Sequence, residues 1–549
     1  YFYWADLYRM YRLFGDKFSP AAKAYIYDGF VRWIRDTNYS LWFNDQNVWH
    51  LIGSENHNAH QKINTFLIAQ LLKNDSQYAN MVLICGKTPD QLYNDNIEWI
   101  KNYIKERAKY GLFIEGSDGY NEVSLYNMYN LMDFCENEQI RELAKMYLDA
   151  FWTLYASESL NGVRVNAQTR VYRRDWRSPG ASLSSLGAYY LGMHNFQNNL
   201  NSLLYPWGFD YGSNYVLYPP LGLLFSNYVP PAGLGEIAKG SLSVNHKRIK
   251  RIPGISRNNY NNATFSFTDK SVNGYDVSPE NSVVQYSYVT PEFSVSSMYE
   301  NFPDTSLTLI SAQNRYNYVT INDNGANRYI FPFLTAALTG DDDTMITYRN
   351  SFDIIQNGPV MIARKKPNSS LNMQNASNVK INPNGIGIYI PDAIGSSLEQ
   401  DSSWWFGKSE SGNVYFGIRL ANNGELTNSQ RPGFKIAPAL LYSGIDTPTV
   451  IIHTEASADF NSYTAFKNTV KSNQVTVSSD TKNITYQSTK WGTTQLDTSV
   501  TNLSQMRKKN NSTAEYETNN LFDNPYISSV FGSGIISLYG LPVQNYNND

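Results

Sequence analysis

Residues 1 to about 225 carry apolar residues at the spacing of amphipathic α-helices. The sharpest helix start is at residues 88–91, where Thr88 supplies an N-cap, Pro89 the first helical position and Gln91 a capping-box partner. Apolar residues then recur on one face until Gly111, which ends the predicted helix. Further helices are predicted over 20–34, 63–71, 125–132 and 140–154. The short polar loops between them favour antiparallel helical hairpins and thus a multi-helix array.

From about residue 226 the pattern changes to a period of two, with β-branched and aromatic runs separated by Asn, Asp, Gly and Pro. The runs predict strands at 283–289, 306–310, 316–321, 385–390, 414–418, 449–453 and 475–478. Many strands without helices between them favour an antiparallel sandwich. The chain has 549 residues, too many for one core. Breaker residues at 228–235 mark the boundary, so we predict a helical domain over 1–228 and a β-sandwich domain over 229–549.

Composition narrows the class of partner. Hydrophobic residues make up 42% and charged residues 17%, which indicates a globular protein rather than a disordered or coiled-coil one. A net charge of −3 provides no drive toward nucleic acid or anionic lipid. Aromatic residues reach 14%, with 42 tyrosines and 11 tryptophans. Flat apolar rings with polar rims are surfaces on which sugars pack, so carbohydrate is the first candidate ligand.

The sequence leaves the compartment open but allows secretion. The two cysteines, Cys85 and Cys135, exclude a disulfide framework. No run of about 18 apolar residues occurs, so we expect no transmembrane span. The first residue is Tyr1 rather than Met, which indicates that an upstream segment is removed or absent from this sequence. We therefore expect a secreted or periplasmic protein.

The densest polar cluster spans residues 49–60, directly before the helix predicted at 63–71. It contains His50, His57 and His60, half of the six histidines, together with Glu55 and Asn56. Such residues suit acid–base chemistry. The plainer alternative is that Asn56 is an N-cap and the histidines form a polar first turn.

A second cluster spans residues 115–129, a turn that runs into the helix predicted at 125–132. It contains Asp118-Gly119, Glu122, Tyr126 and Tyr129. The plainer alternative is that the two tyrosines, spaced i and i+3, are core aromatics at helical spacing.

Together, Asn56-His57 and the segment from Asp118-Gly119 to Tyr126-x-x-Tyr129 resemble motifs of the heparinase II/III-like and alginate-lyase-like polysaccharide lyases. The resemblance implies an α+β multidomain fold, with an N-terminal incomplete α/α toroid followed by a C-terminal antiparallel β-sandwich. It also implies a carbon–oxygen lyase acting on polysaccharides, with Asn56, His57 and Tyr126 as catalytic residues and no cofactor. A histidine from the β part is expected as well, for which His246 and His453 are candidates.

The chemistry explains why these residue types belong together. β-Elimination from a uronic acid removes the C5 proton, which is weakly acidic unless the adjacent carboxylate is neutralised or hydrogen-bonded. The amide of Asn56 can donate to that carboxylate. A base must take the C5 proton and an acid must protonate the leaving glycosidic oxygen. His57 titrates near neutral pH, and Tyr126 can do either job if nearby cations lower its pKa; we expect it to be the acid, with both roles left open.

Cations and aromatic residues for binding an anionic polysaccharide lie in the segment 170–177. The forks of Arg170 and Arg174 can clamp carboxylates, and Trp176 can stack on a sugar. The alternative is a solvated surface stretch that Asp175 partly neutralises. The predicted substrate-binding residues are Glu55, Tyr129, Arg170, Arg174 and Trp176.

Two clusters of potential metal ligands lack the spacing that a metal site needs. His50, Glu55, His57 and His60 do not have the His-Glu-x-x-His spacing of a zinc site, and the three aspartates at 341–343 lack the alternating ligands of a calcium loop. No metal is therefore expected.

Two other functions remain open. The first is a toroid glycoside hydrolase that uses Glu55 or Glu122 with Asp118 as paired carboxylates. The second is a non-catalytic glycan-binding protein. The sequence does not indicate which uronic acid is recognised or which oligomeric state the protein adopts.

Overall fold

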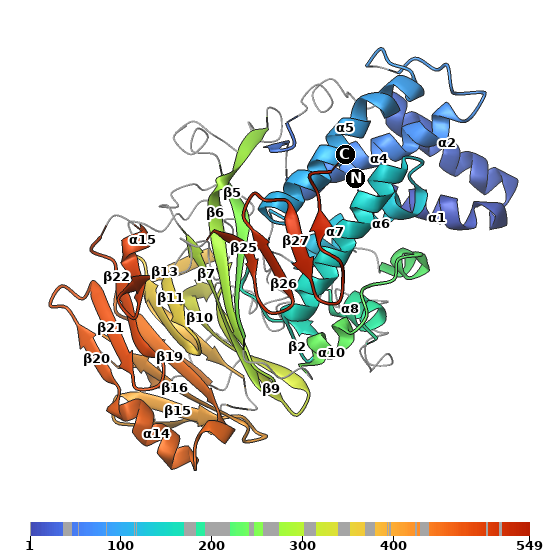
Figure 1. Cartoon of the computed structure of the whole chain (residues 1–549). Helices are drawn as coiled ribbons and strands as arrows, with labels where there is room; N and C mark the ends of the chain where they lie inside the picture. The colour runs from blue at the N-terminus through green and yellow to red at the C-terminus, as the bar shows by residue number, and fades with distance from the viewer. Residues whose placement is uncertain are drawn as a thin grey trace.

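The computed structural model describes residues 2–36, 47–52, 54–83, 85–114, 116, 118–169, 183–192, 220–240, 246–255, 274–300, 315–338, 352–367, 379–391, 394, 397–422, 425–428, 439–500, 503–514 and 519–548. Within them the chain builds a layer of helices and several antiparallel sheets, so the mixed α+β class is confirmed (Figure 1). In Figure 1 a long central sheet separates the helices from the smaller sheets. The α/α toroid and the β-sandwich stay predictions.

All five helices that the periodicity predicts are present, although those at 63–71 and 125–132 begin earlier, at Glu55 and Asp118. The helices Phe2–Phe14 and Ser184–Tyr190 were not predicted. Thr88 forms the predicted capping box: its Oγ1 accepts from Gln91 N at 3.4 Å, and Gln91 Oε1 accepts from Thr88 N at 2.9 Å. The helix then runs to Tyr110 and ends at Gly111, whose φ is 119°. The α-helices are α1 (Phe2–Phe14), α2 (Pro20–Asp36), α4 (Glu55–Lys73), α5 (Pro89–Tyr110), α6 (Asp118–Phe134), α7 (Glu138–Ser157), α8 (Ser184–Tyr190), α10 (Leu234–Lys239), α14 (Tyr463–Ser472) and α15 (Leu503–Met506), with 3-10 turns η1 (Gly15–Lys17), η2 (Pro220–Phe225) and η5 (Ser457–Asp459).

Helix α4 is the centre of the helical layer. It contacts α1, α2, α5 and α6, and side chains on all of its faces are buried, polar ones included. A helix enclosed in this way needs internal partners for its polar groups, because water does not reach them.

A 13-stranded antiparallel sheet forms the middle of the molecule. The strands predicted at 283–289, 316–321 and 385–390 lie in it, whereas 306–310 lies outside the described residues. Its order is β17 (Thr427–Asn428), β18 (Ala439–Ser443), β13 (Val379–Ile390), β10 (Ala326–Leu338), β9 (Tyr318–Asp323), β7 (Phe293–Glu300), β6 (Tyr275–Val289), β5 (His246–Ile255), β25 (Asn520–Asp523), β26 (Ile527–Val530), β27 (Ile535–Leu538) and β28 (Gln544–Asn545), with β1 (His50–Leu51) paired to β6.

The other sheets lie mainly on the far side from the helices. One buried cluster joins Val295 and Ile321 of the large sheet to Ile362 and Ile452 of a six-stranded sheet. Short helices α14 and α15 interrupt the predicted all-β run. The six-stranded sheet has the order β11 (Phe352–Asn357), β12 (Val360–Lys365), β19 (Thr449–Ala456), β16 (Val414–Leu420), β15 (Trp404–Lys408) and β14 (Glu399–Asp401). A five-stranded sheet contains β20 (Gln474–Val477), β21 (Asn483–Ser488), β22 (Gly492–Asp497), β23 (Arg507–Lys509) and β24 (Ser512–Thr513), and two pairs are β2 (Ser159–Leu160) with β3 (Val163–Arg164) and β4 (Gln168–Thr169) with β8 (Arg315–Tyr316).

The helix-facing side of the large sheet binds the segment 158–169, which follows α7. Tyr318 Oη donates to Asn166 O at 2.7 Å, and Asn327 Nδ2 donates to Leu160 O at 2.9 Å. β4 also pairs with β8. Hydrogen bonds to backbone carbonyls therefore attach this segment, which follows α7, to the sheet.

The last strands of the chain return to the helices. Leu521, Tyr526, Ile536 and Tyr546 are buried in the same cluster as the helical core, and β26 and β27 contact α7. In Figure 1 these strands, in red, form the end of the large sheet that lies beside α7. The division at residues 228 and 229 stays a prediction, but the helical core includes residues from beyond it.

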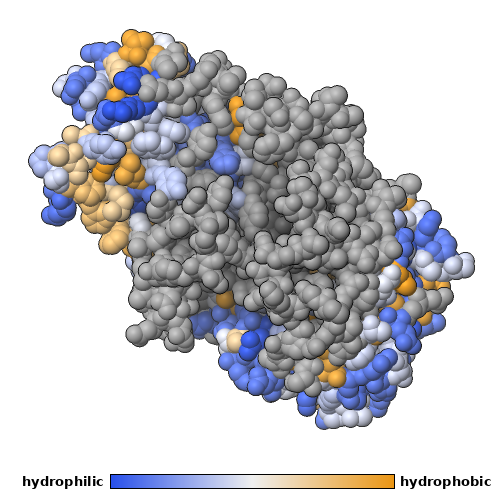
Figure 2. All heavy atoms as spheres, turned by 180° about the vertical axis from the view of Figure 1, so that it is seen from behind, coloured by the Kyte–Doolittle hydropathy of each residue, from blue (hydrophilic) through white to orange (hydrophobic). Residues whose placement is uncertain are grey.

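The described surface is mixed in character. Figure 2 shows mainly hydrophilic residues at the β end and several hydrophobic residues among hydrophilic ones at the helical end. Exposed large apolar side chains include Tyr3, Tyr25 and Phe225. Separate exposed apolar residues are normal for a protein surface. None of the helices described here is long and apolar enough to cross a membrane.

If the C-terminal strands complete the helical core, Leu521→Ala should lower the free energy of unfolding by about 2–5 kcal/mol, because Leu521 is fully buried. Urea unfolding followed by the helical circular dichroism signal measures this. Val530→Ala is the control, since Val530 lies in the same strands at 53% exposure and should change stability by less than about 0.5 kcal/mol. Equal small effects from both variants would contradict the packing.

Candidate functional site

The start of α4 lies where the helices meet the large sheet. β1 pairs with β6 so that His50 is opposite Asp276, and His50 Nδ1 lies 2.8 Å from Asp276 Oδ1. Gly274 has a φ of +75°, and a Cβ there would lie 2.3 Å from His50 Nε2, so the close approach requires glycine. This two-residue strand holds the polar cluster of residues 49–60 against the β part.

Ser54, and not Asn56, is the N-cap of α4. Ser54 Oγ accepts from His57 N at 3.3 Å, lies 2.9 Å from His57 Nδ1, and donates to Asn56 Oδ1. Asn56 Oδ1 also accepts from His57 N at 2.8 Å. The structure therefore brings Asn56 and His57 together through Ser54.

Asn56 is 1% exposed, and its Nδ2 has no hydrogen-bond partner in the part of the chain that the structure describes. An unpaired buried amide donor costs about 1–3 kcal/mol. His57 is half-buried beside it. Asn56 thus has an unsatisfied amide donor next to the imidazole of His57. Both residues lie at the start of α4, where the helix dipole favours anions.

Glu55 is held in a buried ion pair. Arg107 Nε donates to Glu55 Oε1 at 3.0 Å, and Ile114 N donates to Oε2 at 2.8 Å. Glu55 is 2% exposed and Arg107 is fully buried. The predicted role of Glu55 in substrate binding stays a prediction, but its contacts serve to join α4 to α5.

His60 links α4 to α6. Its Nε2 donates to Val123 O at 2.9 Å, and burial lowers its pKa to about 3, so the ring is neutral. Further along, Gln70 Nε2 donates to Phe134 O at 2.8 Å. These two contacts show that α4 and α6 run parallel. His60 lies beside Val123, so by the same difference in residue number His57 lies beside residue 120. Tyr126 is therefore about 9 Å further along the helix axis than His57.

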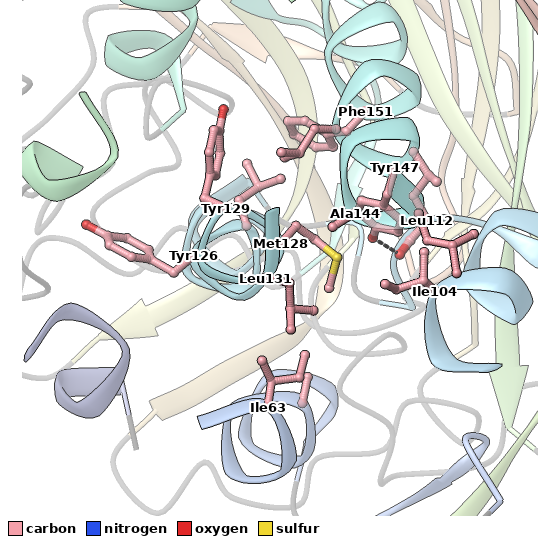
Figure 3. Packing of buried hydrophobic residues seen from close by; sticks show 14 of the residues in the cluster. Ile63, Ile104, Leu112, Tyr126, Met128, Tyr129, Leu131, Ala144, Tyr147 and Phe151 are labelled. Atoms are coloured by element: carbon pink, nitrogen blue, oxygen red, sulfur yellow. Dashed lines mark hydrogen bonds between the residues drawn. The ribbon is translucent and has the colours of Figure 1, made fainter. Parts of the chain in front are cut away.

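Tyr126 is 6% exposed and hydrogen-bonds to Asp6 of α1. Figure 3 shows its ring pointing away from Ile104 and Ala144, which lie on the opposite side of α6. Burial raises the pKa of Asp6 to about 7, although the bond to Tyr126 and the nearby Arg9 act to lower it. Tyr126 therefore joins α6 to α1 through a carboxyl that titrates near neutral pH.

Tyr129 belongs to a buried aromatic cluster. Its hydroxyl accepts from Trp152 Nε1 at 2.8 Å, and its ring stacks on Tyr190 at 5.3 Å and meets Tyr228 edge-on at 5.7 Å. Burial raises its pKa well above the ordinary value. Such a position fits the core-aromatic alternative; its role in substrate binding stays a prediction.

Several predicted residues cannot be placed. Arg170, Arg174 and Trp176 lie outside the described residues, as do the aspartates at 341–343 and the side chains of Asp118, Glu122 and His246.

His453 lies in β19, where its Nδ1 is 2.7 Å from Tyr486 Oη and its Nε2 is 3.0 Å from Glu455 Oε1. Across the described ranges no three His, Cys, Asp or Glu side chains form a group that could hold a metal.

Two residues of this site were missed from the sequence. Ser54 had a visible signal, since a serine directly before a helical run is a common N-cap. Asp6 had only a weak signal: it is the single acidic residue in α1, a helix rich in aromatic residues.

The chain matches no protein-family model and no curated protein. Among solved structures it is similar to the crystal structure of heparinase III, at 12% sequence identity and a TM-score of 0.23, over 89% of this chain and 81% of that one. A likeness this low decides neither the fold nor the activity.

The raised pKa of Asp6 predicts a pH dependence of stability. The folded protein holds this proton with a pKa of about 7, against an ordinary value of 3.8. The protonated carboxyl of Asp6 therefore stabilises the folded protein fully below its ordinary pKa of 3.8, and this stabilisation is lost as pH rises through about 7. In Asp6→Asn, which cannot ionise, urea unfolding between about pH 5 and pH 8 should show a smaller loss of stability with rising pH than in the wild type.

Asp16→Asn is the control, because Asp16 is exposed on the neighbouring turn η1. It should retain the wild-type slope over this range. An Asp6→Asn slope equal to that of the wild type would show that Asp6 does not titrate there.

Proposed function

We propose that the protein is a polysaccharide lyase that cleaves a uronate-containing glycan by β-elimination. The observation that carries the proposal is the buried, unpartnered Nδ2 of Asn56 beside His57 at the start of α4. A substrate carboxylate would satisfy this donor and is the group whose neutralisation makes the C5 proton removable. A polysaccharide substrate also fits the expected secreted or periplasmic location. An incomplete α/α toroid and a β-sandwich are the fold details that accompany this proposal.

In the proposed reaction His57 is the base and Tyr126 the acid. The C5–H electron pair becomes the C4–C5 double bond, the C4–O4 bond breaks, and the leaving oxygen takes a proton from Tyr126. Tyr126 lies further along the axis than His57, and both side chains lean toward the N-termini of their parallel helices, so the longer side chain of Tyr126 would have to cover the remaining distance. Base and acid act on neighbouring positions of one sugar ring, the C5 proton and the O4 oxygen, so both side chains must reach the same bound sugar.

The hydrolase alternative is less well supported. It needs two carboxyl groups that can face a substrate, whereas both carboxylate oxygens of Glu55 are occupied by Arg107 and Ile114. Its other carboxylates, Asp118 and Glu122, have no described side chains. The reaction product distinguishes a lyase from a glycan-binding protein without turnover. Only elimination produces an unsaturated sugar, which absorbs in the ultraviolet.

Asn56→Ala should lower kcat on a uronate polysaccharide by about 10²–10³, as for the loss of an oxyanion donor. Initial rates of ultraviolet-absorbing product, measured on a panel of anionic polysaccharides, test this. Asn96→Ala is the matched control: it removes another buried amide, whose Nδ2 donates to Leu92 O within α5 at 2.7 Å. Equal rates for the folded Asn56→Ala variant and the wild type would refute the role of Asn56.

Tyr126→Phe should lower kcat by about 10²–10⁴ with little change in KM, because only the proton-donating hydroxyl is lost. Tyr129→Phe is the comparison, since its hydroxyl lies one turn further on and contacts Trp152. If Tyr126→Phe only weakens folding, through loss of the Asp6 bond, and keeps full kcat, the acid is a different residue.

A further inference from the structure

Ser54 is the centre of the hydrogen bonds that join the two proposed catalytic side chains. It is 2% exposed. Its Oγ donates to Asn56 Oδ1 and lies 2.9 Å from His57 Nδ1. One hydroxyl thus contacts the amide and the imidazole at the same time.

These contacts determine which end of the Asn56 amide remains for a ligand. The backbone N–H of His57 points at the amide at 2.8 Å, and the hydroxyl of Ser54 donates to the same atom. Because both groups are donors, the amide oxygen must face them. The nitrogen Nδ2 therefore lies at the other end, where it is buried without a partner among the described residues.

A count of protons then determines the form of His57. A serine hydroxyl has a single proton, and Asn56 Oδ1 can only accept, so Ser54 uses its proton on Asn56. The remaining contact, between Ser54 Oγ and His57 Nδ1, is a hydrogen bond only if Nδ1 carries the proton. The neutral imidazole then has its lone pair on Nε2.

We propose that Ser54 is a positioning residue: it holds Asn56 with Nδ2 toward the substrate carboxylate and His57 with Nε2 as the atom that accepts the C5 proton. The reaction itself rests on the proposed function, whereas the proton assignment rests only on the hydrogen bonds. When Nε2 takes the proton, the Nδ1–H bond to Ser54 remains in place. Ser54 thereby orients the ring in both protonation states, as the third member of a catalytic triad does.

Long-range proton–nitrogen NMR of protein labelled with ¹⁵N-histidine tests the assignment without any substrate, because the two tautomers give different cross-peak patterns. The signals of His57 are identified by their loss in His57→Gln. We expect the proton on Nδ1 in the wild type and in Ser54→Thr, which keeps the hydroxyl, and a shift toward Nε2 in Ser54→Ala. A wild-type proton on Nε2, or an unchanged pattern in Ser54→Ala, would overturn the proposal.

Kinetics separate positioning from stability. Ser54→Ala also loses an N-cap, which costs about 1 kcal/mol, so Thr88→Ala, which loses the N-cap of α5, is the control. We expect Ser54→Ala to lower kcat on the order of 10² with little change in KM, Ser54→Thr to restore it, and Thr88→Ala to keep it. Full kcat in Ser54→Ala would overturn the positioning role.

The same measurements distinguish this proposal from the proposed function. If His57 has the expected tautomer but the wild type forms no unsaturated product from any uronate polysaccharide, the lyase proposal fails, while the proton assignment is supported.

Discussion

The buried ion pair between Glu55 and Arg107 is the interaction on which the geometry of the candidate site depends. The guanidinium of Arg107 lies over the rings of Trp49 and Tyr103, at 4.2 and 4.7 Å from their centroids, and also donates to Val48 O at 3.2 Å. It therefore joins the segment before α4, the first residue of α4 and the body of α5. Removing one partner of a buried pair costs about 3–5 kcal/mol, so the position of the neighbouring Asn56 is strongly constrained.

Helices and strands that depend on local signals were predictable. The capping box at Thr88, the stop at Gly111 and the period-two runs of β6 and β16 are read from neighbouring residues, and each appears in the structure. What was missed depends on distant partners. β1 has two residues and exists because β6 pairs with it, and the packing of Leu521 among the helices has no counterpart in its local pattern.

The candidate site shows the same division. Residue types and order pointed to Asn56 and His57, and the structure joins them. Sequence could not show that Glu55, one position earlier, would turn to Arg107, because neighbouring helical residues point in directions about 100° apart. Nor could it show that Tyr126 contacts Asp6, a residue in another helix, since that contact follows from how α1 and α6 pack.

The return of the last strands to the helices has a consequence for biosynthesis. β25 pairs with β5, so that Phe522 is opposite Lys250, and Gly532 N donates to Lys109 O at 2.9 Å, next to the end of α5. A chain synthesised from its N-terminus exposes the incomplete face of the helical core until residues 520–545 emerge. Contacts between residues so far apart in sequence also form slowly. The helical layer that carries Asn56 and His57 can therefore reach its final packing only after residues 520–545 have been synthesised, which leaves the nascent chain open to chaperones and to aggregation in the interval.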